Sequence, residues 1–153
     1  MTATITAINS PAQLRQAYAS GQRNFSLLNL AGADLAGINL SEADLTGANL
    51  AGADLREATL GRANLTRANL RGAKLRRINL VGANLTEADL QGANMYRAIL
   101  IRTDLSRANL SKADLRIGAD LREAKIEGTN FRGALYDEYT KLPEALDLAN
   151  SGM

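Results

Sequence analysis

Arginine is the residue type with the most evident binding chemistry in this chain, and it gathers in the middle. Residues 56–116 carry ten Arg and two Lys against five acidic residues, a net charge of +7, whereas residues 1–55 and 117–153 are mildly acidic. Guanidinium groups bind carboxylates and phosphates through paired hydrogen bonds. The middle of the chain is therefore suited to an anionic partner, either a protein or a nucleic acid.

Residue types that catalyse reactions or bind metals are sparse by comparison. The chain has no His and no Cys, so it lacks the commonest general base, the commonest zinc ligands and any disulfide. Asn or Asp recurs at regular intervals, as at Asp34 and Asp54, but a residue present in every unit normally makes the turn hydrogen bonds of that unit. We therefore predict a non-enzymatic protein with no cofactor, no metal site and no catalytic residue.

A five-residue period positions all of these side chains. Every fifth residue from Leu30 to Leu115 is Leu, except Met95, and the residue two before it is usually Ala, as at Ala33 and Ala43. Neither a helix nor a continuous strand keeps such residues on one side. A short extended segment followed by a two-residue corner does, because residues i and i+2 of a strand share a face. The period predicts a solenoid that buries Leu and Ala along its axis.

The repeated unit, A-(D/N)-L-x-x, resembles that of the pentapeptide-repeat proteins, in particular the small cyanobacterial ones. The resemblance covers residues 24–135, and the stretches 10–18 and 135–144 resemble the segments that precede and close the repeats in that family. It implies an all-β fold, a right-handed quadrilateral β-helix with four pentapeptides per coil. Counting units from Phe25 to Phe131 then gives about five and a half coils.

The whole chain is predicted to form one domain with a cap at each end. Its parts are an N-terminal cap over 1–22, the repeats over 23–137 and a C-terminal cap over 138–153. Residues 2–8 are a β-branched run, which predicts a short strand or an ordered arm.

Each cap is expected to contain a short helix. Ser10 and Pro11 are typical of a helix start and Gly21 of a helix stop, which predicts a helix over 11–20 that covers the open end of the first coil. Pro143 is expected to begin a second helix that runs to about residue 149 and places its Leu residues near the last coil.

The register of the repeats breaks once. Leu115 is followed by Leu121, six residues later, so the segment 116–118 holds one extra residue. We expect this residue to widen a corner, with Gly118 in a conformation that Gly adopts most easily. The same argument predicts positive φ for the glycines that recur at another corner, such as Gly32 and Gly52.

Four units per coil would place residues twenty apart in one column, so the surface can be predicted as well. One face then carries a basic stripe and the next an apolar spot. The candidate partner-binding residues are Arg56, Arg76, Arg77, Arg97, Arg102, Tyr96, Val81, Ile99 and Ile101. We expect these side chains to be largely exposed and to bind a partner. The alternative is that Val and Ile simply favour strands and that Arg keeps the solenoid soluble.

Three functions fit these observations to different degrees. The first is a protein-interaction or regulatory module, as the resemblance implies. The second is a topoisomerase-binding mimic of DNA, which other pentapeptide-repeat proteins are, but a DNA mimic should be acidic and this body is basic. The third is direct nucleic-acid binding by the Arg stripe, although aromatic residues for stacking are scarce.

The remaining expectations concern the location and assembly of the chain. No stretch is long and apolar enough to span a membrane, and the N-terminus lacks the basic and apolar regions of a signal peptide. We therefore expect a cytoplasmic protein without a membrane partner. The oligomeric state stays open between a monomer and a dimer formed through a terminal cap.

Overall fold

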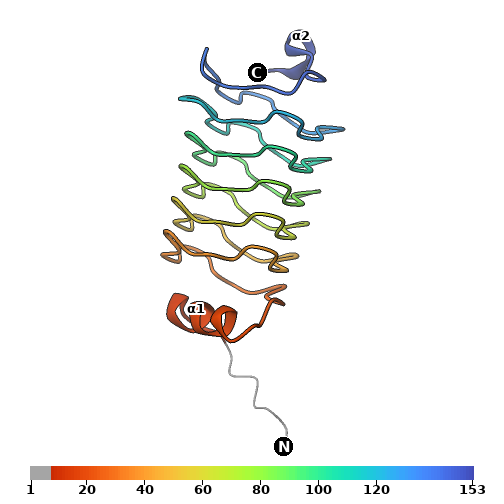
Figure 1. The fold of residues 1–153 in the computed structure, drawn as a ribbon. Helices are drawn as coiled ribbons and strands as arrows, with labels where there is room; N and C mark the ends of the chain where they lie inside the picture. The colour runs from red at the N-terminus through yellow and green to blue at the C-terminus, as the bar shows by residue number, and fades with distance from the viewer. Residues whose placement is uncertain (1–7) are drawn as a thin grey trace, which may run out of the picture.

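The computed structural model describes residues 8–153, which wind into a narrow stack of coils between two short helices (Figure 1). The strand or arm predicted over 2–8 lies outside the described residues, apart from Ile8, which packs against the core. None of the helices in this described part is long and apolar enough to cross a membrane.

Isolated parallel bridges between residues twenty apart, or twenty-one apart in the last coils, hold the coils together. They form four ladders, and we name the four faces by the first residue of each: face 1 from Asn24, face 2 from Asn29, face 3 from Asp34 and face 4 from Asn39. Each coil therefore contains four pentapeptides, as predicted. Each unit contributes a single bridge rather than a long strand, because the chain turns a corner after every extended segment.

The unit 53–57 shows how the sequence produces this geometry. Ala53 and Leu55 are fully buried, whereas Asp54 between them points outward. The N–H of Leu55 donates to the carbonyl of Lys74 in the next coil at 2.9 Å, and the N–H of Asp54 donates to the preceding coil. We call the positions of Asp54 and its equivalents ladder positions, and the two residues that follow each inward Leu the first and second corner residues.

The core is a column of aliphatic side chains along the solenoid axis. Ile38, Ala58, Ile78 and Ala98 lie above one another in successive coils and are all buried, so large and small residues alternate along this column. Interiors of this kind leave little space for extra atoms.

The second corner residue of most units has a left-handed backbone. The predicted glycines adopt it, with φ of 67° at Gly32 and 64° at Gly52. Arg77 and Arg97 adopt it too, at φ of 58° and 55°. This conformation costs a residue with a Cβ atom roughly 1–2 kcal/mol, so the packing of the coils holds these arginines in place.

The inserted residue widens one corner of face 3, as predicted. Ladder spacing changes from twenty residues between Asn79 and Ile99 to twenty-one between Ile99 and Asp120. Ile117 and Gly118 both have positive φ, of 60° and 87°.

The N-terminal helix forms as expected. Helix α1 spans Pro11–Ala19, and the Ser10 side chain accepts a hydrogen bond from the N–H of Gln13 at 3.2 Å. Leu14 is buried against the core and Tyr18 is partly buried there. The helix therefore covers the open end of the first coil (Figure 1).

The prediction of a C-terminal helix that begins at Pro143 is wrong. The ladder of face 4 continues to Lys141, which bridges to Asp120, four residues past the predicted end of the repeats. This pairing keeps the chain extended, and a turn over 144–145 follows. Helix α2 spans only Leu148–Ser151, where the Asp147 side chain accepts from the N–H of Ala149 at 3.0 Å.

The final segment nevertheless contacts the last coil. The carbonyl of Gly152 accepts a hydrogen bond from the N–H of Gly133 at 2.8 Å. In the repeats, a carbonyl of the next coil accepts the equivalent hydrogen bond. Leu146 and Met153 pack against the core, but Leu148, which we expected near it, is 44% exposed.

Candidate partner-binding surface

The structure brings the nine predicted site residues together on two adjoining faces. Arg56, Arg76 and Tyr96 are first corner residues of face 3, and Arg77 and Arg97 occupy the corner that leads to face 4. The members on face 4 are Val81, Ile99, Ile101 and Arg102. We call these nine residues the basic–apolar patch.

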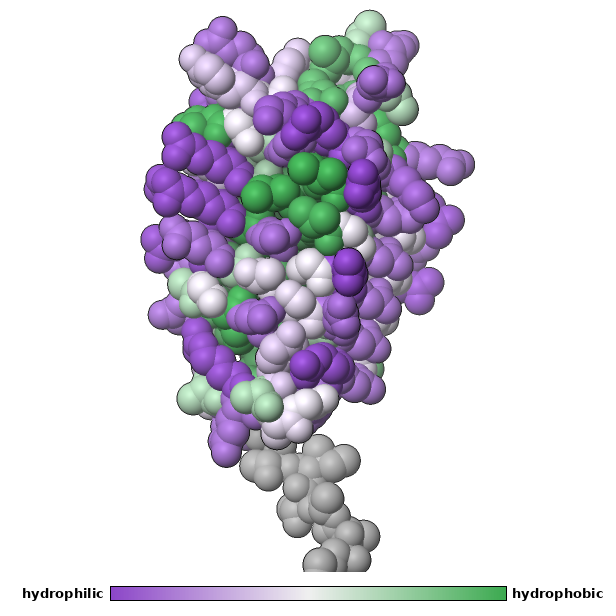
Figure 2. All heavy atoms as spheres, in the orientation of Figure 1, coloured by the Kyte–Doolittle hydropathy of each residue, from purple (hydrophilic) through white to green (hydrophobic). Residues whose placement is uncertain are grey.

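The expectation that the whole patch is largely exposed is wrong for three of its members. Tyr96, Val81 and Ile101 are half-buried. The five arginines are exposed, and Ile99 is 38% exposed. The space-filling view shows one continuous apolar area among hydrophilic residues in the C-terminal half of the molecule (Figure 2).

Ion pairs between coils neutralise most arginines outside face 3. At the corner after face 4, Arg102 pairs with Glu123 at 2.7 Å. At the corner after face 1, Glu87 pairs with Arg67 at 2.7 Å and with Arg107 at 2.9 Å. The Arg67 hydrogen bond is the main reason that the pKa of Glu87 lies below its ordinary value.

The middle of face 3 differs, because its bases outnumber the available acids. Two successive coils place Lys74, Arg76, Arg77 and Arg97 in ladder and corner positions, and no acidic residue occupies those positions in either coil. Arg77 forms an ion pair with Glu57 in the preceding coil, with 3.2 Å between Nη1 and Oε1. Among the described residues, the other three have no carboxylate within ion-pair distance. Positive charge therefore exceeds negative charge on face 3 at these two coils.

Tyr96 lies at the C-terminal edge of this basic group. Its hydroxyl accepts a hydrogen bond from Nη2 of Arg116 at 3.0 Å, and the guanidinium of Arg116 lies 5.8 Å from the ring centroid. A shallow hollow next to it is lined by Arg76, Tyr96, Arg97 and Ile117. The hollow thus combines two unpaired cations with an aromatic and an aliphatic side chain.

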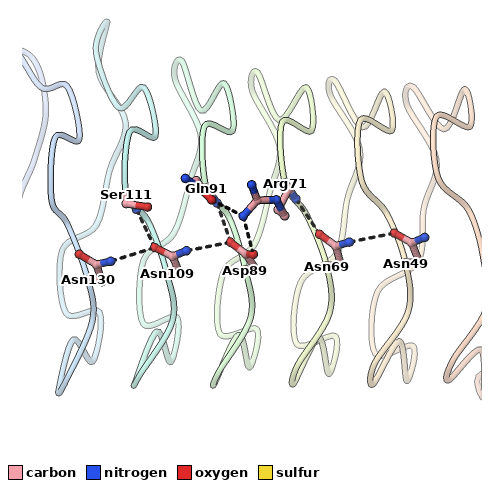
Figure 3. A network of polar contacts seen from close by, with 8 residues as sticks. All are labelled: Asn49, Asn69, Arg71, Asp89, Gln91, Asn109, Ser111 and Asn130. Carbon is pink, nitrogen blue, oxygen red and sulfur yellow. Dashed lines mark hydrogen bonds and ion pairs between the residues drawn. The ribbon is translucent and has the colours of Figure 1, made fainter.

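Ladder side chains elsewhere have a structural role. On face 2, Asn130 donates to Asn109 at 3.1 Å and Asn109 donates to Asp89 at 3.0 Å (Figure 3). Arg71 then connects Asp89 to Asn69, which donates to Asn49 at 3.2 Å. Most ladder residues also accept from the N–H two residues later, as Asn49 does from Ala51. The predicted turn role of Asn and Asp is confirmed. Within residues 8–153, no three His, Cys, Asp or Glu side chains cluster as a metal site would require.

Comparison with known proteins agrees with this architecture. The family model for pentapeptide repeats matches residues 24–62, 63–100 and 98–135. The chain belongs to the pentapeptide repeat family. Proteins of this family fold as right-handed quadrilateral β-helices, which is the fold that the sequence predicts.

Two solved structures of the family are similar over most of the chain. A pentapeptide repeat protein from the thylakoid lumen of Arabidopsis thaliana is 33% identical, with a TM-score of 0.53, over 71% of this chain and 71% of that one. HetL from the cyanobacterium Nostoc sp. strain PCC 7120, a pentapeptide repeat protein involved in heterocyst differentiation regulation, is 30% identical. That match has a TM-score of 0.51 and covers 80% of this chain and 68% of HetL. A search of curated proteins found no match.

Proposed function

We propose that this protein is a non-enzymatic interaction module that binds another protein through the basic–apolar patch. The observation that carries the proposal is the group of unpaired bases, Lys74, Arg76 and Arg97, beside the half-buried apolar residues of face 4. A desolvated apolar centre with Arg and Tyr around it is the usual composition of an energetically important protein interface.

The apolar spot favours a protein partner over a nucleic acid. Nucleic-acid binding without sequence preference combines a basic groove with several stacking aromatic residues, and Tyr96 is the one aromatic side chain of the patch. Val81 and Ile101 have no evident use against a phosphate backbone. A DNA-mimic function has no support on this surface, because such a mimic must present negative charge.

The similarity to HetL supports a regulatory role of this kind, since HetL is involved in heterocyst differentiation regulation. We place the interaction in the cytoplasm as part of this proposal. The thylakoid-lumen origin of the Arabidopsis protein shows that members of the family also work in other compartments.

The proposal is tested by comparing two variants with equal changes of charge. Arg76→Glu with Arg97→Glu reverses two unpaired bases of the patch, and Lys112→Glu with Arg132→Glu reverses two exposed bases beside face 2. Proteins from an extract of the source organism are captured on the immobilised full chain and identified, and their binding to each variant is measured. We expect the first variant to lose a partner that the second retains. Equal binding by both variants would show that the patch is not the interface.

A further inference from the structure

One arrangement of Asp and Arg recurs in three turns of the solenoid. In each, the Asp at the ladder position binds the Arg two residues later, at the first corner position. Oδ1 accepts the backbone N–H of the Arg at 3.2–3.3 Å and its Nε at 2.8–2.9 Å, and Oδ2 accepts its Nη2 at 2.6–2.7 Å. The three pairs are Asp54–Arg56, Asp114–Arg116 and Asp120–Arg122.

A fourth turn has the same arginine but not the same carboxylate. Lys74 occupies the ladder position before Arg76, and an ammonium group cannot accept a hydrogen bond. The backbone of this turn is otherwise regular, since the N–H of Leu75 donates to Asn94 at 2.7 Å and that of Arg77 to Tyr96 at 2.9 Å. The backbone N–H and the guanidinium of Arg76 have no acceptor among residues 8–153.

Arg76 therefore presents, toward the surface, the donor groups that hold one carboxylate in each of the other three turns. The ammonium of Lys74 and the guanidinium of Arg97 add two further unpaired charges beside it. The nearest ladder carboxylates, Asp54 and Asp114, each bind the Arg of their own turn and form no ion pair with Arg76.

We propose that Arg76 binds the carboxylate of an Asp or Glu side chain of the partner protein, in the way that Arg56 binds Asp54. This inference rests on the proposed function and specifies the partner as one with an acidic segment at its contact surface. Lys74 and Arg97 flank the bound carboxylate, and the hollow lined by Tyr96 and Ile117 receives the methylene groups that carry it.

The extent of the basic area favours a carboxylate over a nucleic-acid backbone. The unpaired bases occupy only two coils, about 10 Å along the solenoid at the usual strand spacing. Asp54 and Glu57 lie on one side of them and Asp114 on the other. A duplex lying along this face would extend past the unpaired bases onto coils whose arginines are already paired with these carboxylates.

The substitution Lys74→Asp tests the inference, because it supplies Arg76 with a carboxylate from its own turn. Lys112→Asp is the control, since it makes the same charge change at an exposed corner residue of another face. Isotope-labelled full chain is titrated with N-acetyl-glutamate and, separately, with a short DNA duplex, and the resonances of the Arg76 backbone N–H and Nε–H are followed. Melting temperature and circular dichroism confirm that both variants fold.

We expect N-acetyl-glutamate to shift both Arg76 resonances in the parent and in Lys112→Asp, but not in Lys74→Asp. A partner captured through the patch should bind Lys74→Asp at least tenfold more weakly than Lys112→Asp. The inference is overturned if N-acetyl-glutamate leaves Arg76 unaffected, or if DNA shifts Arg76 and N-acetyl-glutamate does not. It is also overturned if Lys74→Asp binds the partner normally; loss of binding by Arg76→Glu with Arg97→Glu would then leave the proposed function intact.

Discussion

The hydroxyl of Tyr18 in helix α1 donates a hydrogen bond to the carbonyl of Ser41 in the first full coil, at 2.9 Å. In later coils the carbonyl at this first corner position accepts from the N–H of the preceding coil, as Arg56 accepts from Gly37. Tyr18 thus supplies the hydrogen-bond donor that a preceding coil would otherwise provide. Arg15 does the same on face 3, where its Nη2 donates to the carbonyl of Ala36 at 3.3 Å.

The cap predicts that Tyr18→Phe destabilises the protein although it removes a single oxygen. A part-buried carbonyl left without its donor should lower the free energy of unfolding by roughly 1 kcal/mol. Chemical denaturation measures the change. Tyr139→Phe is the control, because Tyr139 is 64% exposed and its hydroxyl has no partner among the described residues. Equal stability of the two variants would show that the Tyr18 hydroxyl does not cap the first coil.

Deleting residues 1–22 should destabilise the protein more than Tyr18→Phe does, and it should also cause the protein to associate. It exposes the polar edge and the apolar end of the first coil, which are the features that promote association between solenoids. We expect a lower melting temperature and a mass that rises with protein concentration in sedimentation experiments. A truncated chain that stays monomeric and melts like the parent would show that α1 is dispensable as a cap.

The filled axis predicts that inward Ala residues do not tolerate larger side chains. Ala63 is fully buried, so Ala63→Leu should lower the free energy of unfolding by about 1–3 kcal/mol. Ala31→Leu makes the same change at an exposed corner of face 2 and should be nearly neutral. Thermal and denaturant unfolding measure the stability of both variants. An equal loss of stability in both would contradict the inward assignment of Ala63.

The Asp–Arg turns predict that stability falls in acid. The side-chain hydrogen bond from Arg56 is the main cause that lowers the pKa of Asp54, and Arg116 and Arg122 lower the pKa of Asp114 and Asp120 in the same way. A lowered pKa means that the folded state binds fewer protons than the unfolded one. The resulting stability is present above the ordinary Asp value of 3.8 and is lost as the pH falls through the lower folded values.

The corresponding measurement is denaturant unfolding between neutral pH and acid. Replacing the three aspartates by Asn keeps the turn acceptor and removes the charge, so stability should depend less steeply on pH below about 4. Asp34→Asn is the control, because Asp34 precedes Ala36 instead of an Arg. If the triple variant shows the same pH dependence as the parent, these carboxylates are not the source of the acid sensitivity.

The repeats could be predicted in detail because one local rule fixes them. The five-residue period determines which residues are inward, and the twenty-residue bridges follow once four units close a coil. The end of the chain could not be predicted, because the start signal at Pro143 competes with a distant interaction. The pairing of Lys141 with Asp120 keeps the chain extended, and Asp147 then becomes the first effective helix cap.

The juxtaposition of the candidate residues could be predicted, but the state of their side chains could not. Twenty-residue columns bring Arg76 and Arg97 together, whereas their lack of carboxylate partners depends on side-chain reach between coils. Lys74 was not among the predicted residues. Its signal in the sequence is a base in a column that otherwise favours Asn and Asp, and its meaning becomes evident only beside the Asp54–Arg56 pair.

The binding affinity of Ile101→Asp for a captured partner tests the central claim most directly. A protein interface centred on the apolar spot predicts a loss of more than about 1 kcal/mol, roughly fivefold in Kd, at an ionic strength where charge effects are screened. Thr86→Asp, at a half-buried first corner residue of face 1, should bind like the parent. An unchanged Kd for Ile101→Asp, with an affinity that falls steeply with salt, would contradict a protein interface at this patch.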